Sequence, residues 1–99
     1  ALFYCEGVPA AIDPMPSDLG SETAPMLIIA STRDALTLYG WANDAARKFP
    51  NSRIVTYVGA QHTPYLESSS CTDTYGTNYL LNLQRPELDV ACPNLFAAP

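Results

Sequence analysis

The sequence predicts an α/β fold with parallel strands that is incomplete on its own. Residues 26–30 form a continuous apolar run, as in strands that are covered on both faces. An amphipathic helix pattern follows, and residues 53–58 then alternate into a second strand at residues 54–58. Strand, helix and strand within about 33 residues make a βαβ unit, whose strands are parallel. Two parallel strands leave open edges and uncovered faces, so further strands are expected outside this chain.

The N-terminal residues are predicted to hold no complete element. An apolar run at 2–4 leads to Cys5 and indicates the end of a strand, and several prolines then break regular structure. We therefore divide the chain into residues 1–20, a strand end and a loop, and residues 21–99, which carry the α/β pattern. The start lacks an initiator Met and a basic signal region, which predicts that a preceding part has been removed.

The helix between the two strands is predicted from its apolar spacing. Residues at i, i+3, i+4, i+7, i+8 and i+11 share one helical face, and here they are Leu38, Trp41, Ala42, Ala45, Ala46 and Phe49. Thr37 is placed to cap the start of this helix. Arg47 and Lys48 suit the negative end of its dipole, and Pro50 ends it.

A second helix is predicted at residues 71–83, with Gly76 weakening its middle. Four residues share one side of this helix: Cys71, Tyr75, Tyr79 and Leu83. The tail at residues 85–99 is predicted to be irregular.

Composition and motifs argue against several classes of function. The net charge of −5 arises from ten acids scattered among five bases, so no nucleic-acid partner is expected. No apolar stretch approaches the roughly 20 residues that span a bilayer, so no membrane partner is expected. A metal site is a competing hypothesis, but one histidine among scattered carboxylates lacks the ligand density that zinc or iron requires. Glycine-rich phosphate motifs are absent too, and we expect no cofactor.

Three cysteines, Cys5, Cys71 and Cys92, are too far apart for a metal-binding Cys-x-x-Cys pair. An odd number of cysteines in a secreted chain implies that one of them forms a disulfide with a cysteine outside the chain. The alternative is a cytosolic protein with three buried thiols.

The polar residues after the two strands are the candidates for chemistry, because active residues of parallel sheets collect beyond the carboxyl ends of the strands. Asp34 follows the first strand, and His62, the one histidine of the chain, follows the second. A carboxylate in this position can orient and stabilise an imidazole base. Asp34 could instead only start a turn, and His62 could be an ordinary loop residue.

The nucleophile of such a site is missing from the sequence. None of the five glycines frames a serine as G-x-S-x-G, the elbow that exposes a serine nucleophile between a strand and a helix. We therefore expect the nucleophile on another portion of the protein; otherwise the chain is inert.

Four segments resemble the C-terminal region of the tripeptidyl aminopeptidase-like α/β-hydrolases, which are secreted serine hydrolases. They are residues 25–34, residues 59–62, Ser70-Cys71 and Ala91-Cys92-Pro93. The resemblance implies that Asp34 is the acid of a Ser-His-Asp triad, in a Gly-Thr-x-Asp segment whose glycine is replaced by Ser31. It also implies that His62 is the base, in a Gly-x-Gly-His segment whose second glycine is replaced by Gln61.

The same resemblance implies the C-terminal portion of an α/β-hydrolase fold, with residues 1–20 returning from a lid region. It implies a disulfide between Cys71 and Cys92, and it makes Cys5 a candidate link to a larger chain that carries the serine. The expected activity is that of a secreted aminopeptidase-type peptidase acting on peptides.

Two alternatives remain open at this stage. One is an esterase or lipase-like hydrolase of the same fold, acting on esters. The other is a catalytically silent secreted binding module, in which Tyr65, Tyr75 and Tyr79 contact a partner.

Overall fold

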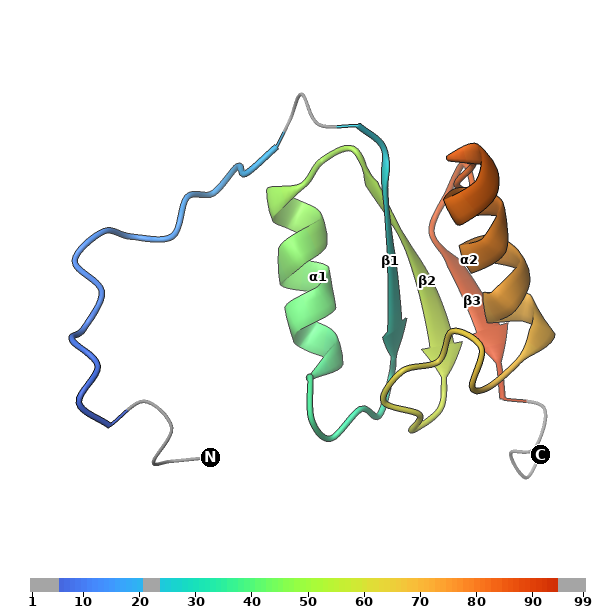
Figure 1. Ribbon diagram of the computed structural model, residues 1–99, viewed down its shortest axis with the longest axis horizontal. Coiled ribbons are helices and arrows are strands. Elements are labelled where there is room, and N and C mark those ends of the chain that lie inside the picture. Colours follow the sequence, from blue (N-terminus) through green and yellow to red (C-terminus); the bar gives the residue numbers. More distant parts are fainter. Residues whose placement is uncertain (1–5, 21–23, 95–99) are drawn as a thin grey trace.

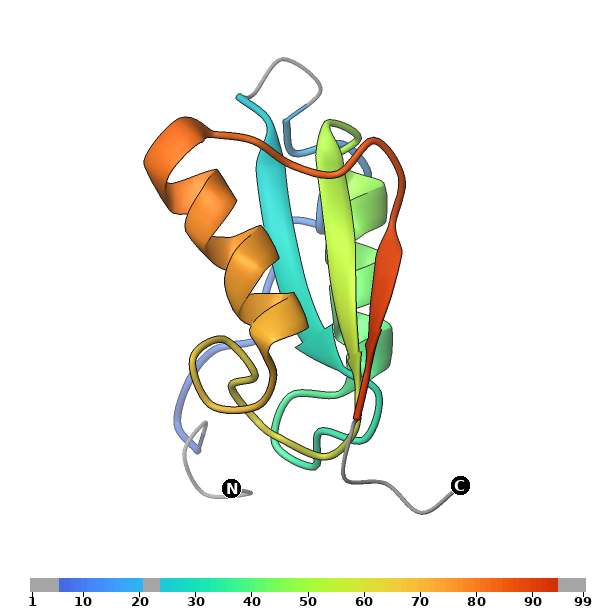
Figure 2. The ribbon, with the colours of Figure 1, turned by 90° about the vertical axis from the view of Figure 1, so that its right-hand side faces the viewer.

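In the computed structural model, residues 6–20 and 24–94 are described, and they contain a parallel sheet of three strands with one helix on each face (Figure 1). The elements are β1 (Met26–Ser31), α1 (Tyr39–Lys48), β2 (Ser52–Val58), α2 (Ser70–Asn82) and β3 (Val90–Pro93). β2 lies between β1 and β3 and is parallel to both. The turned view shows α1 and α2 on opposite sides of the sheet (Figure 2). The predicted βαβ unit and second helix are therefore confirmed.

The prediction of an irregular tail is wrong at β3. This strand pairs with β2 from Val55↔Val90 to Val58↔Pro93. Four residues that end in proline carry little strand signal of their own. The strand depends instead on the open edge of β2 and on a hydrogen bond from Ile54 N to Asp89 Oδ1 at its start (2.8 Å).

The most deeply buried side chains belong to the middle of the sheet. Ile54, Val55 and Tyr57 of β2 and Cys92 of β3 are the buried hydrophobic residues of the described chain. β1 is as apolar as β2, yet five of its six residues are only half-buried. One long edge of β1 carries no strand among residues 6–20 and 24–94. The apolar sequence of β1 is therefore better matched to a central strand than to the edge position that it has here.

The start of α1 corrects the prediction that Thr37 caps this helix. The N-cap position is Leu38, and no side chain caps it. Thr37 therefore lies one residue before the N-cap, and its Oγ1 donates a hydrogen bond to Asp34 Oδ2 (2.8 Å). The predicted apolar face is only partly covered: Trp41 keeps 57% of its surface exposed.

α2 turns small residues inward. Its buried residues are Thr72 and Gly76, whereas Leu83 is exposed. A Cβ atom at Gly76 would lie 2.4 Å from the ring of Tyr65, so the ring occupies the space that a side chain would need. Gly76 is therefore a packing position rather than only a weak point of the helix.

The helix boundaries of α2 follow ordinary capping chemistry. Ser69 accepts a hydrogen bond from Thr72 N at the start of the helix. At the end, Leu83 adopts the left-handed conformation and its N–H bonds to the carbonyls of Asn78 and Tyr79.

A disulfide joins Cys71, at the start of α2, to Cys92 of β3, as the resemblance implied. The two Cα atoms are 5.7 Å apart and the residues are separated by 21 positions. Cys92 is fully buried. The bond therefore ties the edge strand to the helix on one face of the sheet.

Replacing both Cys71 and Cys92 by serine is expected to lower the free energy of unfolding of the complete protein by about 3 kcal/mol, because the loop that the bond closes is released in the unfolded chain. Denaturant unfolding of the double variant measures this loss. Intact mass with and without reductant provides the control, and the absence of the 2 Da shift that one disulfide causes would contradict the bond.

The N-terminal segment has no helix or strand between residues 6 and 20. It is mostly exposed, and Leu19 N donates to Lys48 O at the end of α1 (2.7 Å). The predicted strand end at residues 2–4 and the predicted link through Cys5 lie outside the described residues. No helix in the described ranges is long and apolar enough to cross a membrane.

Candidate functional site

The structure brings Asp34 and His62 together at the carboxyl edge of the sheet. The loop after β1 carries Asp34 and the loop after β2 carries His62, and both loops leave the same end of the strands (Figure 1). His62 Nδ1 lies 2.9 Å from Asp34 Oδ2 and 3.1 Å from Oδ1. Parallel pairing of β1 with β2 produces this encounter, since it sends both loops to one edge.

The Asp34 carboxylate is buried and held by the turn that follows it. Only 6% of the residue is exposed. Oδ1 accepts hydrogen bonds from Leu36 N (2.8 Å) and Thr37 N (3.0 Å), and Oδ2 accepts one from Thr37 Oγ1. Aspartate commonly bonds backbone groups two or three residues ahead in this way.

These contacts determine the charge of Asp34. Burial by itself raises the pKa of the carboxyl group, but the hydrogen bonds from Thr37, His62 and Leu36 outweigh it. The pKa of Asp34 therefore lies well below its ordinary value, and the group is ionised across the physiological range.

This lowered pKa predicts how stability depends on pH. The unfolded chain takes up a proton near the ordinary aspartate pKa of about 3.9, whereas the folded chain resists protonation to lower pH. The stabilisation is complete above about pH 5 and is lost as the pH falls below about 4 towards the folded pKa. Unfolding free energies of the complete protein between pH 3 and 6 measure the effect. Asp34→Asn should flatten this dependence, and an unchanged slope would contradict the assignment.

The ionised carboxylate also determines the tautomer of His62. A carboxylate can only accept hydrogen bonds, so the proton of the imidazole is on Nδ1 and Nδ1 donates to Asp34. Nε2 then carries a lone pair and can accept a proton. The side chain of His62 is 46% exposed, so this nitrogen can be approached by another group. The pair is thus an oriented base.

Backbone contacts hold the two loops against each other beyond the ends of the strands. Thr32 N donates to Tyr57 O (3.0 Å) and Arg33 N donates to Gly59 O (2.9 Å). Gly59 N donates to Thr32 Oγ1 (3.1 Å). Thr32 and Thr37 were not among the predicted site residues. A threonine three residues after a turn-forming aspartate is the signal that points to Thr37.

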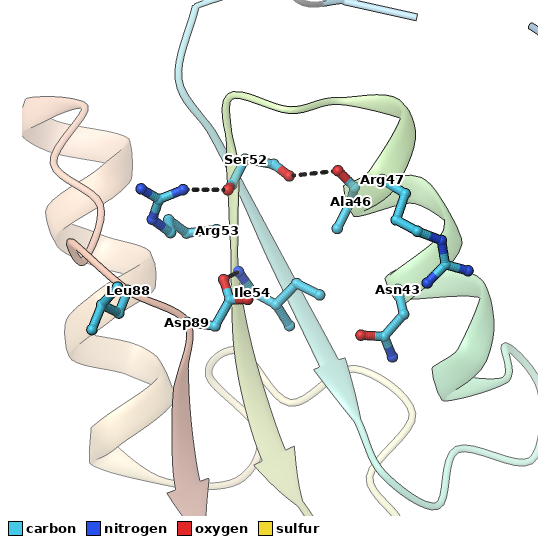
Figure 3. Close-up of a pocket in the computed structure, with 8 residues that line it drawn as sticks. All are labelled: Asn43, Ala46, Arg47, Ser52, Arg53, Ile54, Leu88 and Asp89. Carbon is cyan, nitrogen blue, oxygen red and sulfur yellow. Dashed lines mark hydrogen bonds between the residues drawn. The ribbon is translucent and has the colours of Figure 1, made fainter. Parts of the chain in front are cut away.

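A cavity of about 260 Å³ adjoins the pair. Asp34 and His62 form part of its wall, and the rest is mainly apolar: Ile29, Ala30, Leu38, Trp41 and Ala42, together with Thr37. Another cavity, of about 430 Å³, lies at the opposite end of β2, next to Ser52 and Asp89 (Figure 3). Its position excludes direct contact with His62, so the smaller cavity is the one relevant to the site.

Nothing in the described ranges forms a metal centre, since no group of three or more His, Cys, Asp or Glu residues lies close enough to hold an ion. Ser31, the buried serine on the loop side of β1, donates its hydroxyl to Gln61 O and is 1% exposed. It is therefore not placed as a nucleophile for His62.

Comparison with known proteins supports the predicted resemblance to α/β-hydrolases. A sequence model of the family described as TAP-like protein matches residues 1–92. Serine protease Hip1 of Mycobacterium tuberculosis is 32% identical over 68 residues, which is 69% of this chain and 13% of the relative. Carboxylesterase B of the same organism is 27% identical over 85 residues, 86% of this chain and 16% of the relative. The chain thus spans only a small part of the length of these proteins.

Proposed function

The chain belongs to the TAP-like family of α/β-hydrolases, and we propose that it supplies the acid and the base of a Ser-His-Asp triad in a serine hydrolase. The sheet and its two helices are part of the α/β-hydrolase fold. The observation that carries the proposal is the hydrogen bond between His62 Nδ1 and the buried, ionised Asp34 (2.9 Å to Oδ2).

In the proposed mechanism a serine from outside this chain attacks the carbonyl carbon of a peptide or ester. His62 Nε2 takes the proton of the serine hydroxyl and later returns it to the leaving group. Asp34 remains ionised, keeps the tautomer of His62 and stabilises the imidazolium that forms. Both steps need the orientation that the loops after β1 and β2 provide.

We propose that the serine-bearing portion, on a separate larger chain, adds to the sheet at β1. Three features support this: the open edge of β1, its half-buried apolar residues, and hollows beside it on both faces. On the α1 side lies the cavity that Leu38 and Trp41 line, and on the α2 side lies one of about 220 Å³ between Leu27 and Leu80. A strand paired with β1 would cover both hollows and end near His62. Cys5 is the proposed covalent link between the two portions.

The proposed substrate is a peptide that is cut near its free N-terminus, and the proposed location is extracellular. A relative named as a serine protease supports a peptide substrate, and the Cys71–Cys92 disulfide supports the extracellular location. Ester hydrolysis is the alternative within the same mechanism, supported by the relative named as a carboxylesterase.

A fluorophosphonate probe, which reacts with activated serines, tests the proposal on the purified complete protein. We expect the label on a larger polypeptide and not on the one that contains Asp34 and His62, when both are separated on a denaturing gel under reducing conditions, which release a link through Cys5. Peptide amides with free and acetylated N-termini, and a matched ester, then distinguish the substrates. A protein that neither reacts with the probe nor turns over any of them would be the silent binding module instead.

A further inference from the structure

Ser31 is the last residue of β1 and lies beneath the loop that carries His62. It is 1% exposed, and its hydroxyl donates a hydrogen bond to the backbone carbonyl of Gln61. Gln61 directly precedes His62 in the chain. The hydroxyl therefore bonds the peptide unit that joins Gln61 to His62, across 30 positions of sequence.

This contact holds a stretch of backbone that has few other supports. On one side Gly59 is tied to β2 and to Arg33, and on the other side Pro64 O accepts hydrogen bonds from Glu67 N and Ser68 Oγ. Between these two points, among the described residues, a single hydrogen bond involves the main chain. It is the bond that Gln61 O accepts from the Ser31 hydroxyl. Without it, the main chain next to His62 would be held by hydrogen bonds only at residues two positions away on either side, and His62 itself only through its ring.

Ser31, the last residue of β1, and Asp34, in the loop that follows it, hold His62 at two places. Asp34 holds the ring at Nδ1, and Ser31 holds the main chain just before the ring. One attachment at the strand end and one at the hydrogen-bonded turn after it restrict both the position and the tilt of the imidazole, whereas one attachment leaves the ring able to pivot about Nδ1. Small displacements of a catalytic group reduce rates strongly, by about 100-fold for a shift of 1 Å.

We propose that Ser31 is a positioning residue that fixes His62 for proton transfer. The inference rests on the proposed function, in which His62 is the base. Ser31 does not touch the substrate or the reacting atoms, and it acts through the carbonyl of Gln61 on the placement of His62.

The test compares Ser31→Ala with Ser52→Ala in the complete enzyme. Ser52 is also a buried serine whose hydroxyl donates to a backbone carbonyl, that of Ala46, but it lies at the far end of the sheet from His62. A purely structural role predicts that the two variants behave alike. Active sites are counted with the fluorophosphonate probe, so that kcat refers to folded enzyme only.

Ser31→Ala is expected to lower kcat by about 10- to 100-fold while KM stays within about twofold. Ser52→Ala is expected to leave both constants within about twofold of the parent enzyme. A second measurement does not depend on turnover: the low-field NMR resonance of the His62–Asp34 hydrogen bond, assigned by its loss in His62→Ala, should weaken or broaden in Ser31→Ala and remain in Ser52→Ala.

Equal kcat values and equal resonances in the two serine variants would overturn the proposal for Ser31. If the resonance weakens in Ser31→Ala but His62→Ala keeps full turnover, Ser31 positions His62, and the proposal that His62 is the base of a triad is wrong. If His62→Ala abolishes turnover and Ser31→Ala changes neither kcat nor the resonance, the triad stands and Ser31 has no positioning role.

Discussion

Replacing His62 by alanine in the complete enzyme is expected to lower kcat by about a millionfold, because the serine then has no base to take its proton. The fold should survive, since the side chain is 46% exposed and its hydrogen-bond partner is Asp34. Steady-state turnover of a peptide amide, with active sites counted separately, measures the loss. Added imidazole should restore part of the rate, because the removed ring leaves space beside Asp34.

The matched control is Thr63→Ala, next to His62 in the same loop. Thr63 is exposed, and its replacement should leave kcat within about twofold of the parent value. Near-normal turnover of His62→Ala would exclude the histidine as the base, whatever the behaviour of the control.

Asp34→Asn is expected to lower kcat by about 10⁴-fold at neutral pH. An asparagine oxygen can still accept from Leu36 N and Thr37 N, so the turn is expected to keep its shape. The amide NH₂ would face His62 Nδ1 as a donor, which moves the imidazole proton to Nε2 and removes the base. The loss thus comes from the wrong tautomer rather than from a disordered loop.

Asp44→Asn provides the comparison for this variant, because Asp44 is an exposed aspartate that pairs with Arg47 on α1. Its replacement should change kcat by less than about twofold, since exposed ion pairs contribute little. Thermal unfolding of both variants checks the fold. A folded Asp34→Asn enzyme with turnover equal to that of Asp44→Asn would remove Asp34 from the mechanism.

The main elements were predictable because their signals are local. The apolar run at residues 26–30 corresponds to β1, and the helical spacing at 38–49 corresponds to α1 at Tyr39–Lys48. β3 was missed because Val90–Pro93 is short and becomes a strand through its pairing with β2. The packing role of Gly76 was not predicted, because the ring of Tyr65 that fills the space at this glycine comes from a preceding loop.

The sequence by itself determined the order of strand, helix and strand, and with it the edge at which Asp34 and His62 meet. Periodicity and chain direction are properties of neighbouring residues, so they can be recognised without coordinates. Only the tertiary structure decided that Nδ1 of His62 approaches Asp34 to 2.9 Å, that Thr37 serves the carboxylate rather than the helix, and that Ser31 bonds the carbonyl of Gln61. These contacts depend on the path that two loops take past each other, and for Ser31 the partners are 30 positions apart in the chain.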